Sequence, residues 1–247
     1  MSFGNGANET RTNIIDTIID NEKNRPRSLQ TVTGCSSLGT SCQRQLAYRI
    51  AATPSTRVKS GSWLATIGTS VHAYLETIFA NNPRYLTETP IVVEHDNATV
   101  PGTIDLYDKH THTVVDFKVV GETTLAKAKR GQVSDQYLTQ VNLYGLGLTQ
   151  QGEPVKKVAI MFLPKNKELS DAVFVERDFN PTLARAAMSR FASIKLAVDN
   201  GAKPKDFTPT DAPCMWCDWF DPTTTNLDEG CAGVMPNLNQ LKTNKHK

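Results

Sequence analysis

Two aspartates and a lysine lie on two neighbouring stretches rich in β-branched residues, which are joined by the polar loop 109–112. If this loop is a turn, Asp105 faces Asp116 across an antiparallel pair, roughly 5 Å apart at Cβ, where like charges repel. Side chains alternate along a strand, so Asp116 and Lys118 share one face. The pattern predicts a Mg²⁺ or Mn²⁺ site beside an ammonium group, which is chemistry suited to hydrolysing phosphate esters.

Two further groups near this pair could bind the same ion. Phe117 points to the opposite, buried face of its strand, and its backbone carbonyl is a possible ligand. His72 and Glu76 are four residues apart on a predicted helix, so both can face one site. The simpler alternatives are a surface ion pair for the Asp-x-Lys tripeptide and a hydrogen-bonded histidine for His72.

Gln136, Gln140 and Tyr144 recur every four residues on the helix predicted after the strands. A polar stripe of this kind is usually solvated. Here apolar neighbours offer a packed face, so the Gln and Tyr groups are expected to approach Lys118 or a DNA strand.

The chain has five cysteines, an odd number, and three of them are close together as Cys214-x-x-Cys217 and Cys231. In a reducing compartment such a group binds metal more often than it forms disulfides. Cys42 would complete a four-thiolate set, with Cys35 as its rival for the fourth position. Spacing alone does not choose between an iron-sulfur cluster and structural zinc.

The elements that must position these groups follow from periodicity and breakers. They predict an α/β fold in which helices flank a mixed β-sheet. The expected helices are 14–21, 42–50, 66–80, 134–148 and 181–200, and the expected strands are 90–93, 99–107, 113–120, 156–163 and 172–176.

The composition is that of a globular protein with 247 residues, 39% hydrophobic residues, a net charge of +2 and a pI near 8.2. No stretch is apolar enough to cross a bilayer, and the first residues lack a signal pattern, so we expect a cytoplasmic protein with no membrane partner. A strongly basic surface is excluded, and DNA contacts must come from a local groove. The candidates are Arg44, Arg49, Arg57, Lys59, Lys127, Lys129 and Arg130, with Trp216, Trp219 and Phe220 for base stacking or for packing.

Four segments occur in the order seen in RecB-like members of the PD-(D/E)XK nuclease superfamily: 68–72 (GTSVH), 102–105 (GTID), 116–118 (DFK) and 140–144 (QVNLY). The resemblance spans roughly residues 35 to 235. It implies that His72, Asp105, Asp116 and the Phe117 carbonyl bind metal, that Lys118 is catalytic, and that Gln140 and Tyr144 support the site. The second acidic position of the signature is Asp116 here rather than glutamate, which shortens the reach of that ligand.

One amino-terminal cysteine and three carboxy-terminal ones around such a core resemble the CRISPR-associated and phage-encoded iron-sulfur exonucleases. This resemblance implies a structural 4Fe-4S cluster on Cys42, Cys214, Cys217 and Cys231. The expected organisation is an N-terminal helix and arm (1–34), a nuclease core with the restriction-endonuclease-like fold (35–205), and a cysteine-rich segment with a basic tail (206–247).

The expected function is a divalent-metal-dependent DNA exonuclease that acts on single strands or duplex ends in phage or prokaryotic recombination, replication or CRISPR adaptation. Recombination or CRISPR-adaptation proteins are its possible protein partners. One alternative is a DNA-binding adaptor subunit of such a complex with little or no cutting activity. Another is a zinc-stapled protein whose aspartate pair is only structural.

Overall fold

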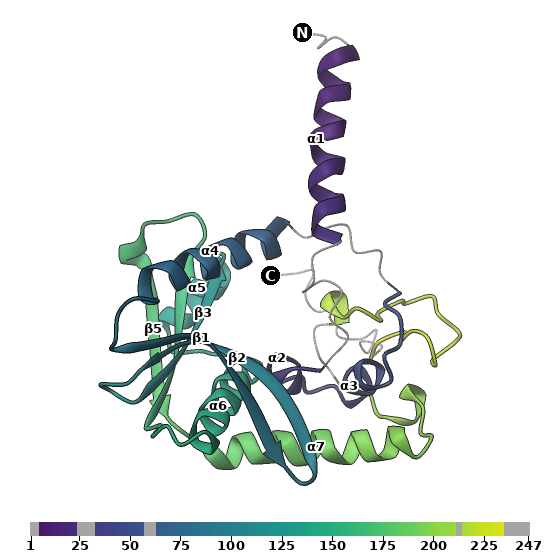
Figure 1. Ribbon diagram of the computed structural model, residues 1–247. Coiled ribbons are helices and arrows are strands. Elements are labelled where there is room, and N and C mark those ends of the chain that lie inside the picture. The colour runs from purple at the N-terminus through teal and green to yellow at the C-terminus, as the bar shows by residue number, and fades with distance from the viewer. Residues whose placement is uncertain (1–4, 24–32, 57–62, 211–213, 235–247) are drawn as a thin grey trace, which may run out of the picture.

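The protein contains one five-stranded mixed sheet in the described residues, on the left in Figure 1. The computed structural model describes residues 5–23, 33–56, 63–210 and 214–234. The strands follow chain order across the sheet: β1 (Tyr85–His95), β2 (Ala98–Asp108), β3 (Thr113–Val120), β4 (Lys157–Pro164) and β5 (Val173–Asp178). All neighbours are antiparallel except β3 and β4. The mixed α/β fold predicted from the sequence is therefore confirmed.

Seven α-helices accompany the sheet in the described residues: α1 (Asn5–Lys23), α2 (Cys35–Leu38), α3 (Gln43–Ile50), α4 (Trp63–Phe79), α5 (Glu122–Lys129), α6 (Asp135–Gln150) and α7 (Pro181–Asp199). Short 3-10 turns occupy Leu169–Asp171, Pro204–Asp206 and Cys214–Trp216. The periodicity missed α2 and α5 because one and two turns are too short to show a repeat. None of the helices in the described ranges has the length and apolarity needed to cross a membrane.

Alternation along β3 divides the core into two layers. Val114 and Val120 pack in the larger cluster with α6 and α7, whereas Val115 and Phe117 pack in a smaller cluster beneath α4. Asp116 and Lys118 therefore belong to the face that α6 covers. Phe117 is 7% exposed, as the sequence predicted for the opposite face.

The parallel pairing of β3 with β4 requires a crossover, and α5 and α6 provide it. Ser134 caps α6 by accepting a hydrogen bond from the Tyr137 backbone N–H. The glycines of α6 allow close packing, since a Cβ at Gly147 would lie 2.7 Å from the Ile91 side chain. This crossover lays the face of α6 that carries Gln140 directly over β3.

β1 and β2 are both distorted at one position. Thr87 pairs with Leu106 and Thr89 with Ile104, yet the intervening residues are not paired. The residue in β1 is Glu88, whose φ of +41° lies in the left-handed region. On β2, Ile104 and Leu106 belong to different core clusters although they are two residues apart, so the strand turns its faces between them. A left-handed non-glycine residue is strained, and such strain is concentrated at functional sites.

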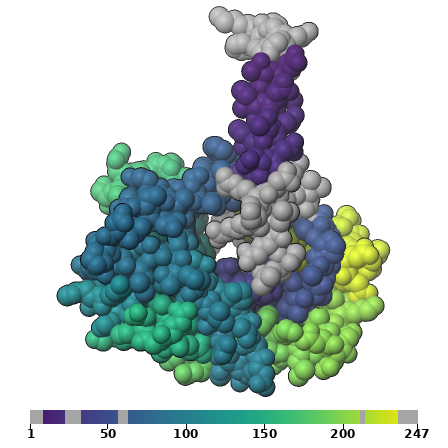
Figure 2. All heavy atoms as spheres, viewed as in Figure 1, coloured from purple at the N-terminus to yellow at the C-terminus, as the bar shows by residue number. Residues whose placement is uncertain are grey.

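The C-terminal segment packs on α3. Trp219 stacks on Tyr48 with ring centroids 5.5 Å apart and donates a hydrogen bond to the Thr53 carbonyl at 2.9 Å. The Cys231 backbone N–H donates to the Trp219 carbonyl at 2.7 Å. The helix α1 stands out from the rest of the molecule (Figures 1 and 2). The basic tail, Arg57 and Lys59, and most of the predicted arm lie outside the described residues.

Candidate functional site

The predicted catalytic side chains all line one cavity of about 470 Å³. They come from four elements: His72 from α4, Asp105 from β2, Asp116 and Lys118 from β3, and Gln140 and Tyr144 from α6. Glu76, by contrast, is exposed and does not line this cavity. The fold thus brings together groups that are up to 72 residues apart in the chain, from 72 to 144.

The two aspartates lie at the point where β2 and β3 separate. The paired register ends at Leu106 with Val115, one step before Asp105 and Asp116. Instead of a backbone bond, the Asp105 carboxylate accepts a hydrogen bond from the Phe117 N–H at 2.7 Å. Asp105 is thereby fixed beside the strand that carries the second aspartate.

Asp116 is held by the lysine two residues further on. Lys118 Nζ lies 2.8 Å from Oδ2 and 3.0 Å from Oδ1, and it donates its hydrogen bond to Oδ1. Oδ2 is buried, and its contact with the Lys118 ammonium is an ion pair rather than a well-directed hydrogen bond. A buried carboxylate oxygen with unused acceptor capacity is suited to a cation.

A chain of polar contacts runs from Lys118 into α6. Lys118 Nζ also donates to Gln140 Oε1 at 3.2 Å, and Gln140 Nε2 donates to the Tyr144 hydroxyl at 2.7 Å. The ammonium lies 5.0 Å from the centroid of the Tyr137 ring. Gln140 and Tyr144 of the predicted stripe therefore lie on the side of the lysine, whereas Gln136 donates to the Ser36 carbonyl at 3.3 Å and does not line this cavity.

His72 bridges the same strands from the other side. Its Nε2 lies 3.0 Å from the Phe117 carbonyl oxygen, and its Nδ1 lies 3.4 Å from Asp105 Oδ1. Both ring nitrogens thus face oxygens that could ligate a divalent ion. His72, Asp105 and the Phe117 carbonyl, which the sequence resemblance implies as metal ligands, therefore lie next to one another.

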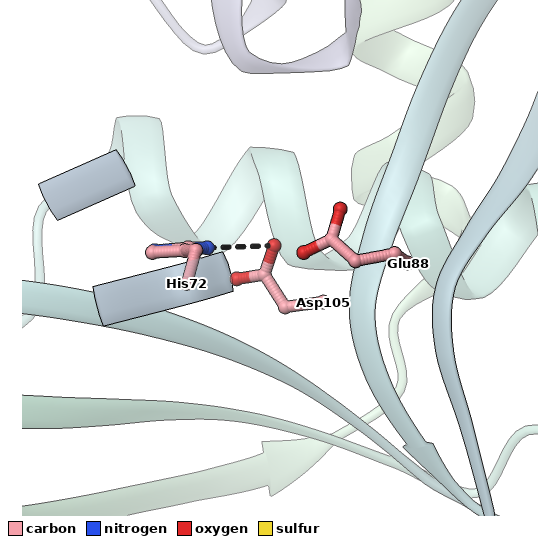
Figure 3. A group of neighbouring side chains, drawn as sticks. All are labelled: His72, Glu88 and Asp105. Atoms are coloured by element: carbon pink, nitrogen blue, oxygen red, sulfur yellow. Dashed lines mark ion pairs between the residues drawn. The ribbon is translucent and has the colours of Figure 1, made fainter. Parts of the chain in front are cut away.

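Glu88 lies beside His72 and Asp105, although the sequence patterns did not predict it as a site residue. One ligand atom each from His72, Glu88 and Asp105 lies within 4.8 Å of the others. Figure 3 shows the Glu88 carboxylate turned toward Asp105, whose other neighbour is the His72 ring. Asp116 does not belong to this set of three. Glu88, on the neighbouring strand, is therefore a further carboxylate that could share an ion with Asp105.

Burial and charge alter the acid-base properties of the cavity. Burial raises the pKa of Asp116 to about 6, against the opposing effect of Lys118. The hydrogen bond to Asp105 raises the pKa of His72. Both groups therefore retain protons at a higher pH than they would in water.

The four cysteines of the predicted cluster line a second cavity, of about 480 Å³. Cys42 is the N-cap of α3, and its sulfur accepts a hydrogen bond from the Gln45 N–H at 3.4 Å. The Cys231 sulfur accepts from Gly233 N–H at 3.4 Å and from the Arg44 guanidinium at 3.7 Å. All five cysteines of the chain are free thiols.

Cys35 lies elsewhere, against the catalytic cavity. Its side chain is 1% exposed, and a Cβ at Gly102 would lie 2.8 Å from its sulfur. Burial raises the pKa of this thiol to about 12, so it is an uncharged core group at neutral pH. Of the two rivals, Cys42 is the one that shares a cavity with the other three cysteines.

The basic and aromatic candidates have different surroundings. Arg49 lines the catalytic cavity, whereas Arg44 donates to the Phe207 carbonyl at 2.9 Å and Lys129 pairs with Asp171 at 3.2 Å. Trp219 is 5% exposed and packs, but Trp216 is 76% exposed.

Comparison with known proteins gives a likeness in fold. No family model and no curated protein matches the sequence. The structure of SSO0001 matches with a TM-score of 0.52 and 14% identity, covering 85% of this chain and 94% of that one. An alkaline exonuclease from Laribacter hongkongensis matches with a TM-score of 0.51 and 10% identity, covering 69% and 89%, and its complex with dAMP matches with a TM-score of 0.50 and 11% identity. The chain therefore shares its fold with these structures.

Glu88→Gln removes one negative charge from the set of three while preserving side-chain size. We expect it to weaken Mn²⁺ binding by at least about tenfold in isothermal titration calorimetry. The matched control is Glu76→Gln on the exposed side of α4, which should bind Mn²⁺ like the unaltered protein. Equal affinities in both variants would remove Glu88 from the site.

Metal binding should weaken as pH falls through about 6. The raised pKa values of Asp116 and His72 mean that both groups are protonated on the acid side, and an ion must displace those protons. Titration of Mn²⁺ at pH 5.5 in two buffers of different ionisation enthalpy should reveal proton release, and the release should be smaller at pH 7.5, where Asp116 is ionised. Affinity independent of pH over this range would contradict the assignment of these ligands.

Proposed function

We propose that this protein is a divalent-metal-dependent deoxyribonuclease that removes nucleotides from DNA ends. The observation that carries the proposal is the chain of contacts from Asp116 through Lys118 and Gln140 to Tyr144, beside the His72, Glu88 and Asp105 group. The exonuclease activity is supported by the fold likeness to an alkaline exonuclease. The existence of a complex of that neighbour with dAMP supports a site that accepts a deoxynucleotide end.

The donor set fits a hard divalent cation. Carboxylates, one imidazole and one backbone carbonyl are ligands that Mg²⁺ and Mn²⁺ accept, and no thiol takes part. His72, Glu88, Asp105, Asp116 and the Phe117 carbonyl would hold it. When bound, such an ion lowers the pKa of water and offsets the negative charge that develops on a phosphate in hydrolysis.

The chain's own residues would position the phosphodiester and receive charge. Lys118 is placed to donate to a phosphate oxygen, and its links to Gln140 and Tyr137 hold the ammonium in one orientation. Tyr144 keeps its proton at neutral pH because burial raises its pKa, so it acts as a hydrogen-bond partner of Gln140. Hydrolysis adds water across one P–O bond and leaves a phosphate on one product and a hydroxyl on the other.

Lys118→Ala tests this role. It should lower the rate of release of end label from DNA in Mg²⁺ or Mn²⁺ on the order of a hundredfold to a thousandfold, because a donor to the developing charge is lost. Asp116→Ala should abolish cutting as well. Arg185→Ala, on the exposed side of α7, is the control and should cut normally.

If the protein binds labelled single-stranded and duplex DNA but cuts neither with any divalent ion, it is instead a DNA-binding adaptor subunit.

We propose that the protein acts in phage or prokaryotic recombination, replication or CRISPR adaptation. This setting rests on the resemblance of the sequence motifs.

We also propose that Cys42, Cys214, Cys217 and Cys231 hold a 4Fe-4S cluster with a structural role. Four thiolates hold either zinc or an iron-sulfur cluster. The choice of the cluster rests on the resemblance of this cysteine pattern to the iron-sulfur exonucleases, and the shared cavity of the four cysteines is compatible with it. The N–H groups directed at the Cys42 and Cys231 sulfurs suit thiolate ligands.

Anaerobic purification and metal analysis test this assignment. We expect four irons per chain and a brown colour, with both lost in Cys42→Ser. Cys35→Ser should keep its iron because Cys35 lies against the other cavity. Zinc without iron in the unaltered protein would contradict the iron-sulfur assignment and indicate that the four cysteines bind a structural zinc ion.

A further inference from the structure

Arg49 lies where the two cavities of the protein approach each other. Its side chain lines the catalytic cavity, the cysteine cavity and a smaller cavity of about 250 Å³. The helix α3 explains this position, since Cys42 caps its first turn and Arg49 belongs to its last. One guanidinium therefore borders both sites.

The segment that carries the cysteines orients this guanidinium. Arg49 pairs with Asp218 at 3.5 Å and lies 5.4 Å from the centroid of the Trp219 ring. Both residues directly follow Cys217, and Trp219 is buried against Tyr48. The position of Arg49 thus depends on how the cysteine segment packs on α3.

Arg49 pairs with a carboxylate outside the candidate metal site, unlike the other basic side chains that line the catalytic cavity. Lys118 and His72 contact Asp116 and Asp105, the carboxylates of the candidate metal site. The carboxylate partner of Arg49 is Asp218, which lines the cysteine cavity instead. A guanidinium has five N–H donors, and this ion pair uses one terminal nitrogen, so the remaining donors suit a phosphate.

Polar, uncharged groups line the route between the cavities. The small cavity shares residues with the catalytic cavity on one side and with the cysteine cavity on the other; the shared residues are Ser36, Ser37, Thr40, Gln45 and Gln136. Hydroxyl and amide groups bind sugar and phosphate without reading sequence. At the far end Trp216 lines the cysteine cavity and is 76% exposed, which suits stacking on a base.

We propose that Arg49 binds a backbone phosphate of single-stranded DNA at the junction of these cavities. The strand then runs from the catalytic cavity along α2 and α3 toward the cysteine segment, and Asp218 and Trp219 keep the guanidinium in place. The choice of DNA as ligand rests on the proposed nuclease function. The route itself rests on the cavities and on the contacts of Arg49.

Fluorescence anisotropy with an end-labelled single-stranded oligonucleotide tests the contact, with Ca²⁺ replacing Mg²⁺ to suppress cutting. Arg49→Ala should weaken binding about tenfold and reduce the slope of log affinity against log salt by about 0.7, the value for one phosphate contact on a single strand. Arg49→Gln, which keeps a stem over Trp219, should lose the same slope. Arg185→Ala, an exposed arginine on α7, is the control. Unaltered affinity and slope in both Arg49 variants would overturn the proposal.

A double-mutant cycle tests the link to the cysteine segment. Asp218→Asn should weaken binding about threefold when Arg49 is present and should have no effect in the Arg49→Ala background. Equal effects in both backgrounds would refute the coupling. An unaltered protein that binds the strand but does not cut it in Mg²⁺ or Mn²⁺ would refute the nuclease function and leave the Arg49 contact intact.

Discussion

The confinement of three carboxylates in one cavity is the constraint on which the rest of the site depends. Two like charges roughly 5 Å apart repel by about 3 kcal/mol at an effective dielectric near 20, so Glu88, Asp105 and Asp116 need positive partners. Lys118 and His72 provide them without a metal. The elevated pKa of Asp116 is a direct result of its burial among these groups. A divalent cation meets the same requirement with its own charge, which is the physical basis for assigning the site to metal-dependent phosphate chemistry.

The scaffold satisfies this constraint by bending strands and covering one of them with a helix. The separation of β2 from β3 leaves the Phe117 N–H free to bind Asp105 rather than a backbone carbonyl. The left-handed conformation of Glu88 distorts β1 at the same level. The α5–α6 crossover then places Gln140 over Lys118. Local strain in one strand and close packing of one helix therefore contribute to a single arrangement of charges.

The second cavity extends this arrangement toward the C-terminal segment. α3 links the two, because it contacts the cysteine segment through Tyr48 and presents Arg49 at its end. A group bound by the four cysteines would stabilise the packing of Trp219 and Asp218 on α3. The contacts of Arg49 with Asp218 and Trp219 would then connect the affinity for substrate to the folding of the cysteine segment.

The sequence by itself determined the five strands and the shared face of Asp116 and Lys118, because strand alternation depends on local geometry. It also predicted that Asp105 lies directly across from Asp116, whereas the paired register of β2 and β3 ends one step earlier, at Leu106 with Val115. It also determined the orientation of Gln140 and Tyr144 through helical periodicity. The tertiary structure alone decided the participation of Glu88, which requires a strand distortion with no sequence signal. It likewise decided that Cys42 rather than Cys35 lies with the distant cysteines, and that Arg49 borders both cavities. These last features depend on packing between segments far apart in the chain, and periodicity carries no information about such distances.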